Sequence, residues 1–425
     1  MGHRESNRFF KQNIYIDMKR IFVMIMGVTV SALFTVSCSD DEDKKSSNQY
    51  TFVVNTTSST ATNYYSGQTL QLGFAGSTDA VSEAVVDENG KAVFLLPANL
   101  ADYSSRGVWF GVKKMVKFFH TLTDAEISSA TLILPDKDAG SIVKDKVNDW
   151  IVALYMGVNK GGKADGEPLY WATGNLITEK INEPGSSTKV VYRIADESES
   201  MEETQMQSSF MKVVKDYELI IDSDDAYVNM PNGTKWNMYQ FGDNTGLRMY
   251  DIEHVEQFVT DTKQMAGSNI VYDISGNKDF DVATQLGGLW RIPTGGKTGN
   301  NEFAAFEDQV EEYANLKPNF AAYDDNGKGI KYDYVVTIDG NDICTNTLKF
   351  PFGGFRHSNY MFKGAGVVAT YWTATADPTM TEIFNQPDMQ REEYTVAFNF
   401  GYIHQLLTWF AHPRTSGMCV RPVTE

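Results

Sequence analysis

The residues Gly287-Gly288-Leu289-Trp290-Arg291-Ile292-Pro293-Thr294 decide how the second half of this chain is interpreted. The two glycines permit a tight turn, and they end a segment, 279–286, whose pattern predicts a short helix. Trp290 is a large apolar anchor whose N–H needs a partner, and Arg291 can fork onto a carboxylate or onto backbone carbonyls. We therefore expect both side chains to serve the fold and not a ligand.

Four further motifs stand in order around this octapeptide. They are Trp-Ala-Thr-Gly-Asn-Leu at 171–176, Gly-Gly-Phe-Arg at 353–356, Tyr-Trp-Thr-Ala-Thr at 371–375 and Val-Arg at 420–421. The five together resemble the Fibrobacter succinogenes major paralogous domain and related families. The resemblance implies that residues 164–425 have the C-type-lectin-like α+β fold, which these families share with formylglycine-generating enzymes.

The sequence departs from that pattern in two places, a polar insertion at 295–301 and a lengthened loop at 380–393. Within the motifs, Trp372, Arg356 and Arg421 are expected to be structural, for the same reasons as Trp290 and Arg291. Another helix is predicted after the octapeptide, because Phe303, Phe306, Val310 and Tyr313 fall on one helical face.

The first half of the chain reads as short strands. β-Branched and aromatic residues cluster at 50–54, 70–74, 92–96, 108–112 and 131–135. Asn89-Gly90 predicts a hairpin turn between 85–86 and 92–96, and Thr123 with Glu126 has the spacing of a capping box. We expect a β-sandwich over 50–163, which resembles prealbumin-like and Ig-like domains of bacterial surface lipoproteins.

A boundary between the two halves is expected where glycines gather among polar residues. These are Gly157, Gly161-Gly162 and Gly166. A fragment that begins near Asp165 would then fold by itself. The predicted fold class is α+β: a β-sandwich domain at 50–163, followed by a lectin-like domain at 164–425.

The N-terminal residues have the pattern of a targeting sequence. Met18-Lys19-Arg20 is followed by an apolar run at 21–36, which is shorter than the about 20 residues of a transmembrane helix. The run ends at Ser37-Cys38 and resembles the lipobox of bacterial lipoproteins, although Thr35 stands where Leu is usual. The resemblance implies a leader and signal peptide over 1–37 and a lipid on Cys38. An uncleaved membrane anchor is the alternative.

Directly after Cys38 comes the acidic run Ser39-Asp40-Asp41-Glu42-Asp43. It resembles the surface-export signal of Bacteroidetes lipoproteins, while its composition also fits a solvated tether over 38–49. Both interpretations can hold together, and the lipoprotein resemblance implies a protein at the outer membrane, anchored in lipid through Cys38. The export signal implies that it faces the cell exterior.

Composition limits the chemistry. The 425 residues hold 37 Lys and Arg against 55 Asp and Glu, a net charge of −18, which argues against nucleic-acid partners. The six His are dispersed, the Asp clusters lack EF-hand spacing, and no P-loop, dinucleotide fingerprint or nucleophile elbow occurs. We expect no catalytic residues, no metal and no cofactor. Cys344 and Cys419 either pair in a disulfide or stay as two thiols.

Aromatic side chains near the end of the chain are the remaining candidates for recognition. Trp409 and Phe410, followed by His412 and Arg414, are expected in an exposed loop, with Tyr402 nearby. Sugar faces stack on such rings, so the sequence predicts a non-catalytic surface module for binding or adhesion to a glycan or a surface protein. The alternative is a structural or accessory subunit of a fimbria-like assembly.

Overall fold

The computed structural model describes residues 49–56, 65–137, 150–159, 165–181, 189–195, 235–244, 273–296, 301–306, 308, 322–323, 329–356, 362–363, 369–376, 396–403, 406–413 and 416–425. Cys38 and the acidic run lie outside these ranges. Residues 48–425 form one compact unit. Within the described ranges, no helix has the length and apolar character needed to cross a membrane.

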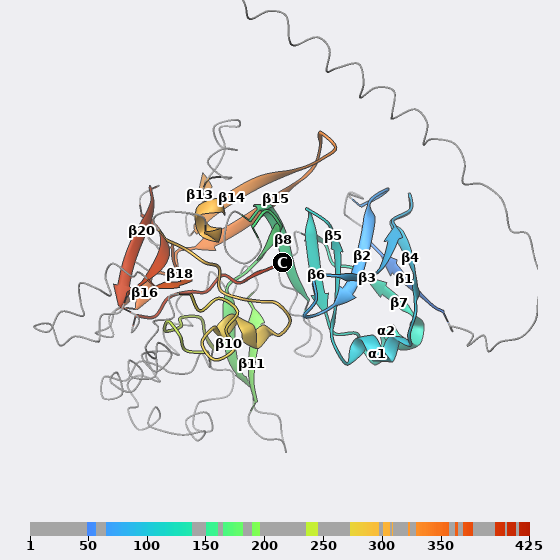
Figure 1. The fold of residues 1–425 in the computed structure, drawn as a ribbon, viewed down its shortest axis with the longest axis horizontal. Helices are drawn as coiled ribbons and strands as arrows, with labels where there is room; N and C mark the ends of the chain where they lie inside the picture. The colour runs from blue at the N-terminus through green and yellow to red at the C-terminus, as the bar shows by residue number, and fades with distance from the viewer. Residues whose placement is uncertain are drawn as a thin grey trace, which may run out of the picture. The chain divides into compact units, whose positions relative to one another are not determined.

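The fold is predominantly β structure, and its largest sheet has seven antiparallel strands (Figure 1). In spatial order they are β21 (Val423–Thr424), β9 (Pro168–Ala172), β8 (Ile151–Val158), β6 (Val116–His120), β5 (Val108–Val112), β2 (Thr69–Phe74) and β3 (Ala80–Val85). The last described strand of the chain therefore forms one edge of a sheet that the early strands begin.

A three-stranded sheet packs against part of this large sheet. It has the order β4 (Lys91–Leu96), β1 (Tyr50–Asn55), β7 (Thr131–Ile133), with β1 antiparallel to β4 and parallel to β7. The ring of Phe110 on β5 lies 6.1 Å from that of Phe52 on β1 and 6.3 Å from that of Phe94 on β4. Alternate residues of β4 are buried and exposed, as expected for a sheet with one face on a core.

The predicted turn at Asn89-Gly90 exists, but the predicted hairpin is wrong. Gly90 has a φ of 78°, and its N–H donates to Asp87, so the tight turn is formed. The strands on either side belong to different sheets, since β3 pairs with β2 and β4 pairs with β1. The turn carries the chain from one sheet to the other, because β3 pairs with the preceding strand β2 while β4 pairs with the more distant β1.

The helices within the described residues are short. They are α1 (Leu100–Ser104), α2 (Asp124–Ser129) and the 3-10 helix η4 (Val282–Leu286), and residues 302–306 are also helical. The capping box at the start of α2 is confirmed, with Thr123 and Glu126 bonded reciprocally. The helix expected over 279–286 is confirmed as the shorter η4, which ends at Gly287. Phe303 and Phe306 are buried as predicted.

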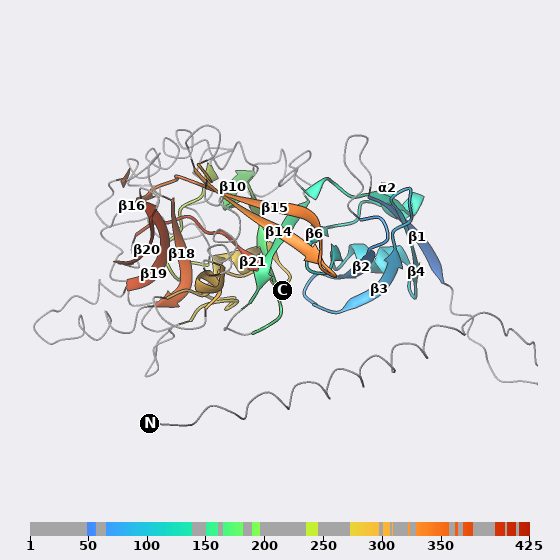
Figure 2. The same ribbon diagram turned by 90° about the horizontal axis from the view of Figure 1, so that it is seen from above.

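The remaining strands form smaller sheets and one long hairpin, labelled β14 and β15 in Figure 2. Their bounds are β10 (Leu176–Ile181), β11 (Lys189–Ile194), β12 (Lys235–Trp236), β13 (Ala322–Tyr323), β14 (Gly329–Ile338), β15 (Asn341–Pro351), β16 (Phe355–Arg356), β17 (Phe362–Lys363), β18 (Ala369–Ala376), β19 (Val396–Ile403) and β20 (Leu406–Pro413).

The expected boundary between residues 163 and 164 falls between two paired strands. β8 precedes it and β9 follows it, and the two are antiparallel neighbours in the large sheet. From β15, the side chain of Asn346 donates to the main-chain oxygens of Met115 and Tyr155, at 2.8 and 2.9 Å. The strands before the boundary therefore share hydrogen bonds and a core with those after it.

Candidate functional site

A cavity of about 490 Å³ opens beside the octapeptide 287–294. Its walls come from the loop before η4, from η4 itself, from the glycine turn and from the end of the large sheet. The lining residues are Gly276, Lys278, Thr284, Gln285, Gly287, Gly288, Leu289, Trp290, Arg291 and Glu425. Its size is in the range of small-molecule sites, which are commonly about 300–1,000 Å³.

Asp281 holds the loop that forms one wall. Its buried carboxylate accepts hydrogen bonds from the backbone N–H groups of Gly276, Ala283 and Ile292, at 2.8 to 2.9 Å. Burial raises the pKa of Asp281 to about 7, although the three N–H donors and the charge of Arg291 act to lower it. One side chain thus fixes the bend before η4, the first turn of η4 and the strand-like segment that contains Arg291.

The glycine turn needs its glycines. Gly287 and Gly288 have φ values of 79° and 61°, in the left-handed region that other residues resist. A Cβ on Gly288 would lie 3.3 Å from the backbone nitrogen of Gly76, in the turn after β2. The turn therefore packs closely against the end of a strand that precedes it by about two hundred residues in sequence.

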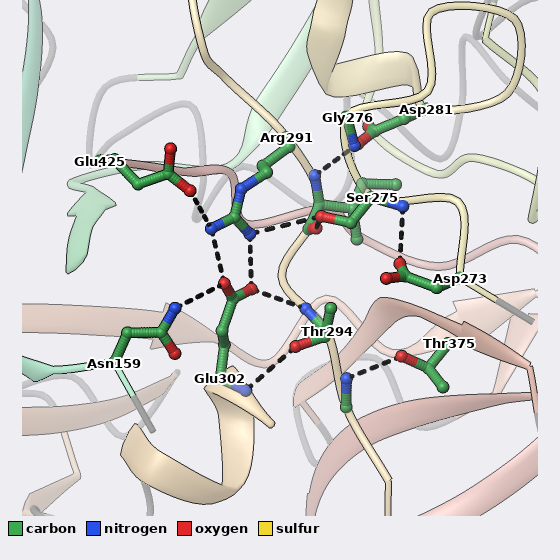
Figure 3. Close-up of polar contacts among 12 residues, drawn as sticks. Asn159, Asp273, Ser275, Gly276, Asp281, Arg291, Thr294, Glu302, Thr375 and Glu425 are labelled. Atoms are coloured by element: carbon green, nitrogen blue, oxygen red, sulfur yellow. Dashed lines mark hydrogen bonds and ion pairs between the residues drawn. The ribbon is translucent and has the colours of Figure 1, made fainter. Parts of the chain in front are cut away.

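Arg291 is the centre of a buried ionic network at the base of the cavity (Figure 3). Its two terminal nitrogens contact both carboxylate oxygens of Glu302, at 2.5 and 2.6 Å, and one of them also donates to Glu425 at 2.8 Å. The side chain of Glu302 is fully buried. Burial acts to lower the pKa of Arg291, but the hydrogen bonds and charges of Glu302 and Glu425 outweigh it and raise the pKa.

Neutral donors complete the network around Glu302. The carboxylate accepts from the side chain of Asn159 at 3.1 Å and from the backbone N–H of Thr294 at 2.8 Å. The hydroxyl of Thr294 in turn accepts from the backbone N–H of Glu302 at 3.1 Å. Figure 3 shows how these groups converge from a strand end, the octapeptide and the following helix. A buried charge is costly unless it is paired and hydrogen-bonded in this way.

Lys117 lies at the other side of Glu425. Its ammonium donates to the main-chain oxygen of Glu425 at 2.7 Å and lies 4.3 Å from the centre of the Trp109 ring. Burial lowers the pKa of Lys117 to about 8, against the opposing charge of Glu425. Glu425 is thus held through its side chain by Arg291 and through its backbone by Lys117.

Trp290, Trp372 and Arg421 are buried, as predicted, although Trp290 also lines the cavity. Trp290 is 2% exposed, and its ring lies 5.0 Å from that of Phe119. Trp372 is 1% exposed and donates from its indole nitrogen to the carbonyl of Tyr239 at 2.6 Å. Arg421 is fully buried and donates to two backbone carbonyls, those of Ala172 and Lys349.

The prediction of a loop around Trp409 is wrong, because the backbone there forms a strand. Trp409, Phe410 and His412 belong to strand β20, which pairs over its whole length with β19, the strand that holds Tyr402. The run Leu-Leu-Thr-Trp-Phe is rich in strand-favouring residues, and this preference prevails over the loop interpretation. His412 is partly buried, with its ring 4.7 Å from that of Phe355.

Arg414 and Cys38, the predicted lipidation site, lie outside the described residues. The ligand-contact role of Trp409, Phe410 and Tyr402 stays a prediction. The two sulfurs of Cys344 and Cys419 are not bonded to each other; Cys419 is buried and Cys344 partly so. No cluster of three or more potential metal-ligating side chains occurs among the described residues.

Sequence reasoning found Arg291 but missed its partners. The pattern predicted a forked contact onto a carboxylate or onto backbone carbonyls and did not identify Glu302 or Glu425. It also missed Asp281 and Lys117. The spacing offers one weak signal, since Asp281 precedes η4 as an N-cap residue would. Comparison of the chain with protein-family models, with curated proteins and with solved structures returned no match.

Proposed function

We propose that this protein is a lipid-anchored binding module on the outside of the cell and that it carries out no catalysis. The proposed location rests on the sequence. It has a basic segment at Met18, an apolar run, Ser37-Cys38 and the acidic residues that follow. The C-type-lectin-like character of residues 164–425 is part of the same proposal, which rests on the order of the five motifs. Among the motif residues, Trp372, Arg291 and Arg421 are buried and hydrogen-bonded within the protein, which supports their role in such a scaffold.

The cavity beside Arg291 is the observation that supports a binding role. It presents different kinds of hydrogen-bonding group within one concave surface: the Glu425 carboxylate, the Thr284 hydroxyl and the exposed Gln285 side chain. These groups can accept from and donate to the hydroxyls of a neutral sugar. The rigid network below them fixes the wall, which lowers the cost of ordering the site on binding. We propose a short glycan as the ligand.

The lipid anchor is tested by metabolic labelling with a fatty acid in cells that express the full chain. Wild-type protein is expected to take up label, and Cys38→Ala is expected to take up none. Ser39→Ala, one residue further along, is the matched control and should keep the label. Label that persists in Cys38→Ala would remove the anchor from the proposal.

The binding role is tested with a glycan array and the chain from Ser39 to Glu425, which contains every described residue. Gln285→Trp places a bulky ring at the exposed wall of the cavity and is expected to abolish binding. Glu88→Ala, in the exposed turn after β3, is the control and should bind like wild type. If wild type binds no glycan, or if Gln285→Trp binds equally well, the cavity is not a glycan site.

A further inference from the structure

The three-stranded sheet β4–β1–β7 has one face on the core and one outer face. The strand register and the alternation of burial define which residues share the outer face. They are Thr51, Val53 and Asn55 on β1, Lys91, Val93 and Leu95 on β4, and Thr131 and Ile133 on β7. We call this set the outer face.

Three of the five exposed large hydrophobic side chains among the described residues lie on the outer face. Val93 is 46% exposed, Leu95 is 56% exposed and Ile133 is 63% exposed. Among the described residues, the other large hydrophobic side chains that are exposed are Val81 and Val85 on β3, in the other sheet. Single exposed hydrophobic residues are ordinary, whereas several on one flat face indicate a surface that meets something apolar.

The outer face also lacks carboxylates. The chain has 55 Asp and Glu and a net charge of −18, yet none of the eight outer-face residues is acidic, and Lys91 is their one charged member. An anionic surface would repel most of this protein but would not repel this face. The exposed hydrophobic side chains indicate an apolar partner, and the absence of acidic residues indicates that this partner is neutral or negatively charged at its rim.

The short distance in sequence between Cys38 and β1 brings a membrane within reach of the outer face. β1 begins at Tyr50, twelve residues after Cys38, and Tyr50 pairs with Leu96 beside the exposed Leu95. A chain of that length spans at most about 40 Å when extended. A lipid on Cys38 would therefore hold the end of the sheet that carries Thr51 and Leu95 close to the membrane.

We propose that the outer face rests on the lipid surface in which the acyl chain of Cys38 is inserted. The proposal depends on the lipid anchor proposed above. Val93, Leu95 and Ile133 would enter the boundary between headgroups and acyl chains, where apolar area leaves water, while Lys91 would meet anionic headgroups. The lipid on Cys38 would be one point of attachment and the outer face a second, and two points of attachment would fix the orientation of the folded part on the membrane.

A second copy of the chain is a weaker candidate for this face. A stable protein interface takes about 20–30 residues from each partner, and the outer face offers eight. A lipid surface has no shape to match, so a small flat face suffices when a covalent tether already supplies a high local concentration.

The test separates the face from the anchor. The chain from Ser39 to Glu425, with a histidine tag in place of Cys38, is held on vesicles of phosphatidylethanolamine and phosphatidylglycerol that contain a nickel-chelating lipid. Release by imidazole is followed over time. The variant Val93→Thr/Leu95→Thr/Ile133→Thr keeps strand-favouring side chains but replaces apolar groups by hydroxyls. It is expected to leave the vesicles about tenfold faster than wild type.

The matched control is Val81→Thr/Val85→Thr, which makes the same kind of change on the exposed side of β3 and should leave at the wild-type rate. The proposal is overturned if the triple variant leaves as slowly as wild type, or if the control variant accelerates release equally. It is also overturned if sedimentation without vesicles shows a wild-type dimer that the triple variant lacks, because loss of the dimer would by itself speed release. The fatty-acid labelling of Cys38 is measured separately, so failure of the anchor and failure of the face are distinct results.

Discussion

Replacing Arg291 by methionine is expected to destabilise the protein strongly, because it leaves the carboxylate of Glu302 buried without its cation. Glu302 is fully buried, and Arg291 contacts both of its oxygens. Removing one member of such a pair typically costs about 3–5 kcal/mol. That is a large part of the about 5–15 kcal/mol by which a native protein is stable.

The network also predicts a partial rescue. In the double variant Arg291→Met/Glu302→Gln, the charge is gone while the amide oxygen of Gln can still accept from the N–H of Thr294. We expect the double variant to be more stable than Arg291→Met alone, because removing the charge of residue 302 relieves the uncompensated buried carboxylate. Urea unfolding followed by tryptophan fluorescence gives the free energies, provided that the slopes stay equal.

Lys331→Met is the control, because Lys331 and Asp333 form a pair at 3.5 Å with the lysine 37% exposed. Such surface pairs contribute about 0–1 kcal/mol. The reasoning is refuted if Arg291→Met costs no more than Lys331→Met. It is also refuted if Glu302→Gln makes the Arg291→Met background less stable, since the carboxylate would then need no cation.

Three further results are expected. Because the pKa of Asp281 rises from 3.8 to about 7 on folding, the native state holds the proton longer, so stability should fall as the pH rises through this range; unfolding curves of Asp281→Asn should lack this loss. Trp372→Ala should cost about 3–5 kcal/mol in urea unfolding, through a cavity and the loss of its hydrogen bond to the Tyr239 carbonyl; a variant as stable as wild type would contradict its anchor role. A fragment that begins at Asp165 should show no cooperative thermal transition, because β9 would lose β8 as its neighbour; a sharp transition would restore the boundary first expected there.

Local patterns fixed local structure well. The capping box at Thr123 and the turn at Gly90 formed because each depends on residues close in sequence. The burial of Trp290 and Trp372 was also predictable, since a large apolar ring in a strand or turn pattern has few other uses. The strand β20 was missed, although its composition favoured a strand, because its aromatic residues were interpreted as a recognition loop.

Pairing of distant segments was beyond the sequence. Nothing in the pattern at Asn89-Gly90 says that the strands beside it belong to two different sheets. Nor do the glycines near residue 160 reveal that β8 and β9 are neighbours in one sheet.

The sequence by itself determined the acidic charge, the largely β character and the burial of Trp290 and Trp372, and it predicts the lipid anchor at Cys38. The tertiary structure alone decided that Glu302 and Glu425 pair with Arg291. It also decided that the last described strand forms an edge of the large sheet and that the outer face of the sheet containing β1 is left exposed. The reason is physical. Capping, turns and burial preference act over a few residues, whereas ion pairs and sheet order depend on which distant segments together exclude water best.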